Sequence, residues 1–238
     1  MNNTAKQYIL AFDTATEHFS VAVLNMQGKT LSSHNELAFR HLSDNLHPAI
    51  EKCMQDAKVE FTELCAIVCT KGPGSFTSVR VGLAAAKGFA FALNIPLITF
   101  NSLEALALGY IGQNEPNHHL HVWVEAHGGN VYCTTFNKAG EALGDIESLP
   151  ASIAATKLNE NDTVIGSGCQ KHAEHLPSTI KQGEEFAYVN AEHIGKLGIQ
   201  AFRENSERVN DVKPLYIHPL HYHKTYNADG TPIVKDEA

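Results

Sequence analysis

Short apolar runs of strand length alternate with longer amphipathic runs in a repeated order, and this order constrains the fold most. In the first half, strands are predicted at 8–12, 19–24, 29–36, 64–69 and 97–100, and helices at 44–57, 78–93 and 102–111. In the second half, strands are predicted at 121–125, 131–136, a third ending near 149, and 163–166, with helices at 150–158 and 191–205. Ser102 is the predicted N-cap of its helix. Two units of β-β-β-α-β-α type indicate an internal duplication.

This order is similar to the duplicated ribonuclease-H-like fold of actin-like ATPases and sugar kinases. It predicts an α/β protein of two small domains with mixed sheets and outer helices. We expect an N-terminal domain at 1–112 and a smaller, degenerate C-terminal domain at 113–217, joined near Pro116. The helix at 191–205 is a candidate to pack back on the first domain. An irregular tail is predicted at 218–238.

The charge balance weighs against a protein that binds nucleic acid by itself. Lys and Arg total 18 against 26 Asp and Glu, a formal net charge of -8. Proteins that bind a phosphate backbone alone usually carry a basic surplus, although Lys71, Arg80 and Lys87 could form a local basic strip. Five cysteines without a CxxC pair favour reduced thiols. With a polar start and no apolar run of about 20 residues, we expect a cytoplasmic chain without membrane contact.

Two loops lie where an actin-like fold could hold phosphate. One begins at Asp13, after the first strand, and the other is the KGPGSFT loop at 71–77, which leads into a helix. Amides and hydroxyls at the positive end of a helix can hold an anion. The candidate residues of such a phosphate or nucleotide loop are Asp13, Thr14, Gly72, Gly74, Ser75 and Thr77. The alternative is a tight connection whose polar side chains satisfy turn amides, and the sequence leaves both open.

Three segments carry a resemblance to a known family. They are ILAFDTATE at 9–17, GPGSFTSVR at 72–80 and NSLEA at 101–105, and they resemble the TsaB family, also called YeaZ. The resemblance covers roughly the first 110 residues closely. It implies a non-catalytic scaffold subunit of the bacterial complex that makes N6-threonylcarbamoyladenosine at position 37 of ANN-decoding tRNAs. Such a subunit pairs with and activates TsaD, the paralogous transferase, together with the ATPase TsaE.

The resemblance also implies where partners bind. The helices at 44–57 and 78–93 would form a bundle with TsaD, or a homodimer when TsaD is absent. The small residues of the second helix permit close approach of another helix. The predicted partner-binding residues are Leu46, Ile50, Arg80, Gly82, Leu83, Ala86, Lys87 and Ala90. We expect no cofactor tightly bound by this chain, ATP in the assembled complex, and tRNA contact only through the complex.

The differences from TsaD indicate that this chain is not itself an enzyme. TsaD carries a metal-binding HxxxH pair in the segment that matches 101–106, and here those two positions are Ser102 and Leu106. A hydroxyl and an isobutyl group cannot replace two imidazoles on a metal ion. We therefore predict no catalytic residues and no metal site.

The second half departs further from the family pattern. Family members commonly have DAR-x-GEVY where this chain has Glu125, His127 and Asn130, which weakens a second phosphate loop. The histidine groups at 118–121 and 218–223 have no matching acid nearby in the sequence, so they are predicted to lie in surface loops. The alternative function is a stand-alone small actin-fold ATPase or kinase, which would need acids at both phosphate loops.

Overall fold

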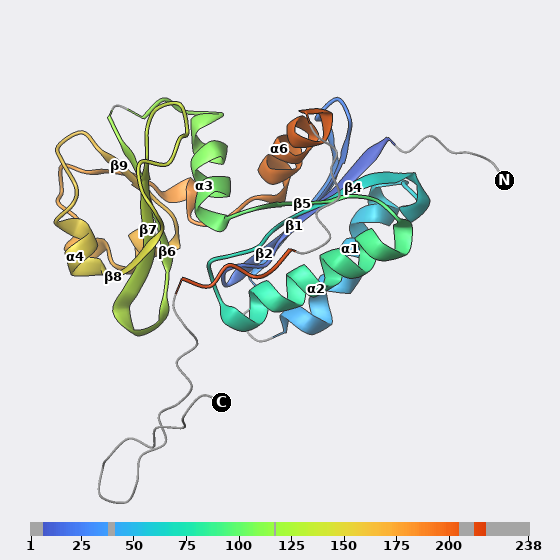
Figure 1. Ribbon diagram of the computed structural model, residues 1–238, viewed down its shortest axis with the longest axis horizontal. Coiled ribbons are helices and arrows are strands. Elements are labelled where there is room, and N and C mark those ends of the chain that lie inside the picture. Colours follow the sequence, from blue (N-terminus) through green and yellow to red (C-terminus); the bar gives the residue numbers. More distant parts are fainter. Residues whose placement is uncertain (1–6, 38–40, 117, 205–211, 218–238) are drawn as a thin grey trace, which may run out of the picture.

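Two five-stranded sheets with the same strand order form the frame of the molecule (Figure 1). The computed structural model describes residues 7–37, 41–116, 118–204 and 212–217. The first half contains β1 (Tyr8–Asp13), β2 (His18–Asn25), β3 (Thr30–Leu37), α1 (Leu42–Ala57), β4 (Leu64–Thr70), α2 (Phe76–Leu93), β5 (Leu97–Phe100) and α3 (Ser102–Ile111). The second half contains β6 (Leu120–Glu125), β7 (Asn130–Phe136), β8 (Glu147–Pro150), α4 (Ala151–Ala155), β9 (Thr163–Ile165), α5 (Ser167–Lys171), β10 (Lys181–Gly183) and α6 (Ala191–Glu204).

The two halves repeat one topology completely. The strand order is β3-β2-β1-β4-β5 in the first sheet and β10-β9-β6-β7-β8 in the second, so β6 matches β1. In each sheet the first three strands pair antiparallel, and the two later strands run parallel to the central one. The predicted duplicated α/β fold with mixed sheets is therefore confirmed. The short elements α5 and β10 escaped prediction because runs of 5 and 3 residues show no periodicity.

The last helix of each half packs on the sheet of the other half. Helix α3 contacts β6 and β7, whereas α6 contacts β1, β2 and β4. Figure 1 shows both helices between the two sheets, while α1 and α2 cover the opposite face of the first sheet. One apolar cluster accordingly joins the facing sides of both sheets. The division into domains at 1–112 and 113–217 stays a prediction. The tail expected at 218–238 lies outside the described residues.

Helix α2 combines a buried face with an apolar composition. Among the described helices it alone is long and apolar enough to cross a membrane, with a mean hydropathy of 1.3 over 18 residues. Its residues Val79, Leu83 and Ala86 are buried, and the helix packs on β4. The apolar composition is that of a helix which packs within the first domain.

The N-cap of α3 is Asn101, and the prediction of Ser102 was wrong by one residue. The Asn101 side chain accepts a hydrogen bond from the Glu104 amide at 2.7 Å, and the Glu104 carboxylate accepts from the Asn101 amide at 3.4 Å. This reciprocal pair is a capping box. Ser102 lies one position further on, fully buried, and its hydroxyl has no hydrogen-bond partner.

Replacing the cap should therefore cost stability, whereas replacing its neighbour should not. We expect Asn101→Ala to lower the free energy of unfolding by about 1 kcal/mol. The matched control Ser102→Ala should leave it unchanged or raise it, because it removes a buried hydroxyl without a partner. Urea denaturation followed by circular dichroism measures both. A larger loss for Ser102→Ala than for Asn101→Ala would contradict this assignment.

Candidate functional site

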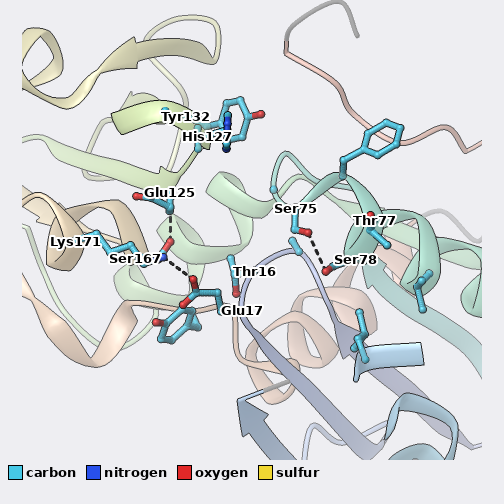
Figure 2. A pocket seen from close by; sticks show the side chains of 18 of the residues that line it. Thr16, Glu17, Ser75, Thr77, Ser78, Glu125, His127, Tyr132, Ser167 and Lys171 are labelled. Atoms are coloured by element: carbon cyan, nitrogen blue, oxygen red, sulfur yellow. Dashed lines mark hydrogen bonds and ion pairs between the residues drawn. The ribbon is translucent and has the colours of Figure 1, made fainter. Parts of the chain in front are cut away.

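A cleft of about 700 Å³ opens between the two halves of the molecule (Figure 2). The N-terminal half lines it with Ala15, Thr16, Glu17, Leu42, Ser43, Val81 and residues 74–78. The C-terminal half contributes residues 125–128, Tyr132, Ser167, Lys171 and Tyr188. The loop after β1 and the start of α2 thus face the loop after β6 and the start of α5. These are equivalent positions in the duplicated units.

The KGPGSFT loop packs directly on the loop after β1. The Ser75 amide donates to the Ala15 carbonyl at 2.7 Å, and a Cβ at Gly74 would lie 2.0 Å from that same carbonyl oxygen. Glycine is therefore required at position 74 because the two backbones lie too close for a side chain. The Ser75 amide, one of the donors expected to face an anion, already has a partner within the protein.

Asp13 and Thr14 lie beneath the cleft and do not line it. The Thr70 hydroxyl donates to Asp13 Oδ1, and the Ala15 amide donates to Asp13 Oδ2 at 3.3 Å. The Thr14 hydroxyl donates to the carbonyl of Ser78 at 2.8 Å, which ties the β1 loop to α2. Burial raises the pKa of Asp13 to about 7, against the hydrogen bonds that lower it.

Of the six predicted phosphate-loop residues, three line the cleft and three do not. Gly74, Ser75 and Thr77 line it, whereas Asp13, Thr14 and Gly72 do not. Gly72 has a φ of +93°, and a Cβ there would lie 3.1 Å from the carbonyl oxygen of Leu215. Close backbone packing therefore accounts for both glycines, and the phosphate-binding role of this loop stays a prediction.

The opposite wall of the cleft is held by polar contacts that the sequence did not predict. Lys171 forms an ion pair with Glu17 at 2.6 Å, which links α5 to the loop after β1 (Figure 2). Partial burial lowers the pKa of Lys171, but the bond to Glu17 outweighs it and the net shift is upward. The Glu125 amide donates to Ser167 Oγ at 3.0 Å, and the Glu125 carboxylate bonds His172 at 2.9 Å. No motif marked Lys171, because the pair joins residues 154 positions apart.

The predicted partner face of the helices needs correction. Six of the predicted residues lie on the buried faces of α1 and α2: Leu46, Ile50, Gly82, Leu83, Ala86 and Ala90. They pack inside the first domain, so they cannot contact a partner in this fold. The spacing of small residues identified a closely packed face correctly, but the close neighbour of Gly82 is Thr14 of the same chain. Arg80 and Lys87 remain exposed.

A different face of α2 is open to solvent. Its exposed residues are Phe76, Thr77, Arg80, Ala84, Lys87, Gly88, Phe91 and Ala92, which we call the outer face of α2. Phe91 is 89% exposed, more than any other large hydrophobic residue among those described. The Arg80 guanidinium lies 4.9 Å from the centre of the Phe76 ring at the other end of the helix. The outer face thus combines small residues, two cations and one prominent aromatic ring.

Two glycines of α2 should respond oppositely to the same substitution. A Cβ at Gly82 would lie 2.1 Å from Thr14 Oγ1 and 3.1 Å from the other Thr14 side-chain carbons, whereas Gly88 has nothing within 4 Å. We expect Gly82→Ala to lower the free energy of unfolding by about 1–3 kcal/mol through overpacking. Gly88→Ala should raise it by about 0.5–1 kcal/mol through helix propensity. Urea denaturation that gave both variants the same sign would contradict this packing.

The buried Asp13 should make stability depend on pH. Its pKa is raised in the folded state from 3.8 to about 7, so its contribution is present below pH 4 and lost by about pH 7. Relative to Asp13→Asn, the wild type should lose about 2–3 kcal/mol of unfolding free energy between pH 5 and pH 8. The comparison cancels the histidine titrations common to both proteins. Parallel stability profiles from urea denaturation would show that Asp13 is not buried as a neutral acid.

The fold and the cleft define a protein of the actin-like, ribonuclease-H-like class. An activator of 2-hydroxyisocaproyl-CoA dehydratase from Clostridium difficile, solved with bound ADPNP, shares this fold at a TM-score of 0.55 and 9% identity, covering 83% of this chain and 96% of that one. Residues 33–193 match the family described as TsaD: tRNA N6-adenosine threonylcarbamoyltransferase. The structure of YeaZ from Pseudomonas aeruginosa matches at a TM-score of 0.72 and 26% identity, over 88% of this chain and 99% of that one.

The sequence comparison is more specific. The tRNA threonylcarbamoyladenosine biosynthesis protein TsaB of Escherichia coli K12 is 33% identical over 219 residues, which are 88% of this chain and 94% of that protein. The chain belongs to the TsaB family. The resemblance predicted from three segments in the first half is therefore confirmed over nearly the whole length of this relative.

Proposed function

We propose that this chain is the accessory subunit of a tRNA N6-threonylcarbamoyladenosine synthesis complex and does not itself catalyse the transfer. The observation that carries the proposal is the 33% sequence identity to E. coli TsaB, which extends over 94% of that protein's length. The family match to TsaD between residues 33 and 193 supports a paralogous transferase as the partner. The positions where TsaD carries its histidine pair are here Ser102 and Leu106, both buried. Neither side chain can hold a metal ion in the place of those imidazoles.

The chemistry of the cleft supports an accessory role over the stand-alone ATPase or kinase. Among the described lining residues, Lys171 is the only lysine or arginine, and its charge is paired with Glu17. A second acid, Glu125, lies on the same wall. A nucleoside triphosphate needs cations or free amides around its phosphates. Acids at both loops are also what the ATPase alternative needs, so Glu17 and Glu125 do not decide between the two. A bound triphosphate is disfavoured because the one described lysine is already paired. We propose that this chain holds no nucleotide tightly by itself and that ATP joins only in the assembled complex.

The outer face of α2 is the proposed surface for the transferase. Ala84, Gly88 and Ala92 would let a partner helix come close, since side chains of this size leave the backbone accessible. Phe91, at 89% exposure, would supply the apolar anchor that protein interfaces favour. Arg80 and Lys87, predicted from the sequence as partner residues, lie on this same face. The same face could pair two copies of this chain when the transferase is absent, so the two associations should compete.

Further parts of the assembly follow from the family resemblance. We propose that TsaE joins the pair, that tRNA binds only through the complex, and that the chain acts in the cytoplasm. The five cysteines are all free thiols and buried, which is compatible with a reducing compartment.

The proposed interface can be tested with one pair of surface variants. Phe91→Asp places a charge at the apolar anchor of the outer face, and we expect it to weaken binding to the organism's own threonylcarbamoyltransferase at least about tenfold. Isothermal titration calorimetry with the two purified proteins measures the affinity. Stability should not change, because the Phe91 ring is 89% exposed.

Ile153→Asp is the matched control. It also replaces an exposed hydrophobic residue, 49% exposed, but lies on α4 in the other half of the chain. We expect it to bind the transferase as the wild type does. Equal affinities for Phe91→Asp and wild type would place the interface elsewhere. An absence of binding by the wild type would refute the pairing itself.

A further inference from the structure

Three histidines that are close in sequence converge on one buried carboxylate. His118 Nδ1 lies 2.7 Å from Asp162 Oδ1, and His121 Nε2 lies 2.9 Å from Asp162 Oδ2. The third, His119, has its Nδ1 3.8 Å from Asp162 Oδ1. The predicted surface loop holds for His118 and His119, which precede β6 and reach solvent, but not for His121, which lies buried on β6. The acid lies 41 or more positions away in sequence, so no local spacing could have marked it.

The fold brings these residues together because β6 and β9 are neighbouring parallel strands. His118 and His119 directly precede β6, and Asp162 directly precedes β9. The Thr163 amide donates to the His119 carbonyl at 2.9 Å, which aligns the two strand ends. The cluster thus lies at the end of β6 opposite to Glu125 and the cleft, and it takes no part in the site described above.

Asp162 is held firmly in place. Its carboxylate accepts hydrogen bonds from the amides of His119 at 3.2 Å and Asn159 at 2.9 Å, and its side chain is fully buried. The ring of His121 is also fixed, because its second nitrogen bonds the Thr135 hydroxyl at 3.0 Å. Both nitrogens of His121 are therefore occupied, and this residue orients the carboxylate as a positioning residue.

His118 and His119 are different, because their rings reach solvent. Their side chains are 52% and 36% exposed, and their ring centres are 3.9 Å apart. One nitrogen from each ring and one oxygen of Asp162 all lie within 4.8 Å of one another. Donor atoms that bind zinc at about 2.0–2.2 Å in a tetrahedral site lie about 3.3–3.6 Å from one another, so the two exposed rings would have to rotate to close the site. Asp162 could hold the turn before β9 through its bonds to the His119 and Asn159 amides alone. That structural role does not require the rings of His118 and His119 beside the same carboxylate.

We propose that His118, His119 and Asp162 form a binding site for a divalent transition-metal ion of the zinc type. Two imidazoles and one carboxylate are ligands that zinc accepts, and water would complete a four-coordinate site at this exposed edge. His121 would hold the second carboxylate oxygen, as outer-shell partners of metal ligands commonly do. A bound ion would join the ends of β6 and β9. The site is independent of the proposed role in tRNA modification.

The only tryptophan of the chain gives a local probe of this site. Trp123 lies on β6, and it lines a small cavity together with His119 and His121. We expect Co²⁺ to quench the Trp123 fluorescence of the full chain with a stoichiometry of one, and Zn²⁺ to reverse the quenching by competition. His118→Ala and His119→Ala should each weaken Co²⁺ binding at least about tenfold. Without metal, His119→Ala should unfold at the temperature of the wild type, because its ring lies 3.8 Å from Asp162 and reaches solvent. His118→Ala should unfold at a lower temperature, because it removes the 2.7 Å hydrogen bond to the buried carboxylate.

Two control variants separate this site from other histidines. His175→Ala alters a second group, formed with His172 and Glu174, and the triple change of His218, His221 and His223 to Ala removes the tail histidines. We expect both controls to bind Co²⁺ as the wild type does. The proposal is wrong if the wild type gives no saturable quenching, if His118→Ala and His119→Ala bind normally, or if either control loses binding.

Discussion

The close contact between the loop after β1 and the start of α2 fixes how α2 packs on the first sheet. The Ala15 carbonyl accepts the Ser75 amide and leaves no room for a side chain at position 74. Further along α2, the Thr14 hydroxyl donates to the Ser78 carbonyl, and the Thr14 side chain fills the space beside Gly82. These contacts fix α2 on the first sheet, so one face of the helix is committed to the fold and the other is left exposed.

This packing accounts for both parts of the proposed function. The Ser75 amide of the KGPGSFT loop is used to join α2 to the loop after β1, and Lys171, the one lysine among the described residues of the cleft, is paired with Glu17. What remains available is the outer face of α2, which ends at the exposed ring of Phe91. The proposed accessory role would use this exposed helix surface to bind the transferase.

Much of the fold could be predicted from the sequence, whereas the sites could be predicted only in part. The apolar runs of β1 and β4 are long enough to identify buried strands, and α3 was predicted at its observed place with its N-cap one residue too late. Helical periodicity, however, shows that α2 has a closely packed face without saying which neighbour fills it. Ala86 was therefore predicted as a partner contact although it lies in the core. Contacts across the sheets, such as Asp162 with the histidines before β6, have no local sequence signal.

We propose that this chain activates a transferase without performing the transfer. The most direct measurement is the rate of N6-threonylcarbamoyladenosine formation on tRNA in a reconstituted reaction, with the organism's own transferase and this chain added separately and together. We expect no modified tRNA with this chain alone and a faster rate with both proteins than with the transferase alone. Product formed by this chain alone, or a rate that does not change when it is added, would contradict the proposed role.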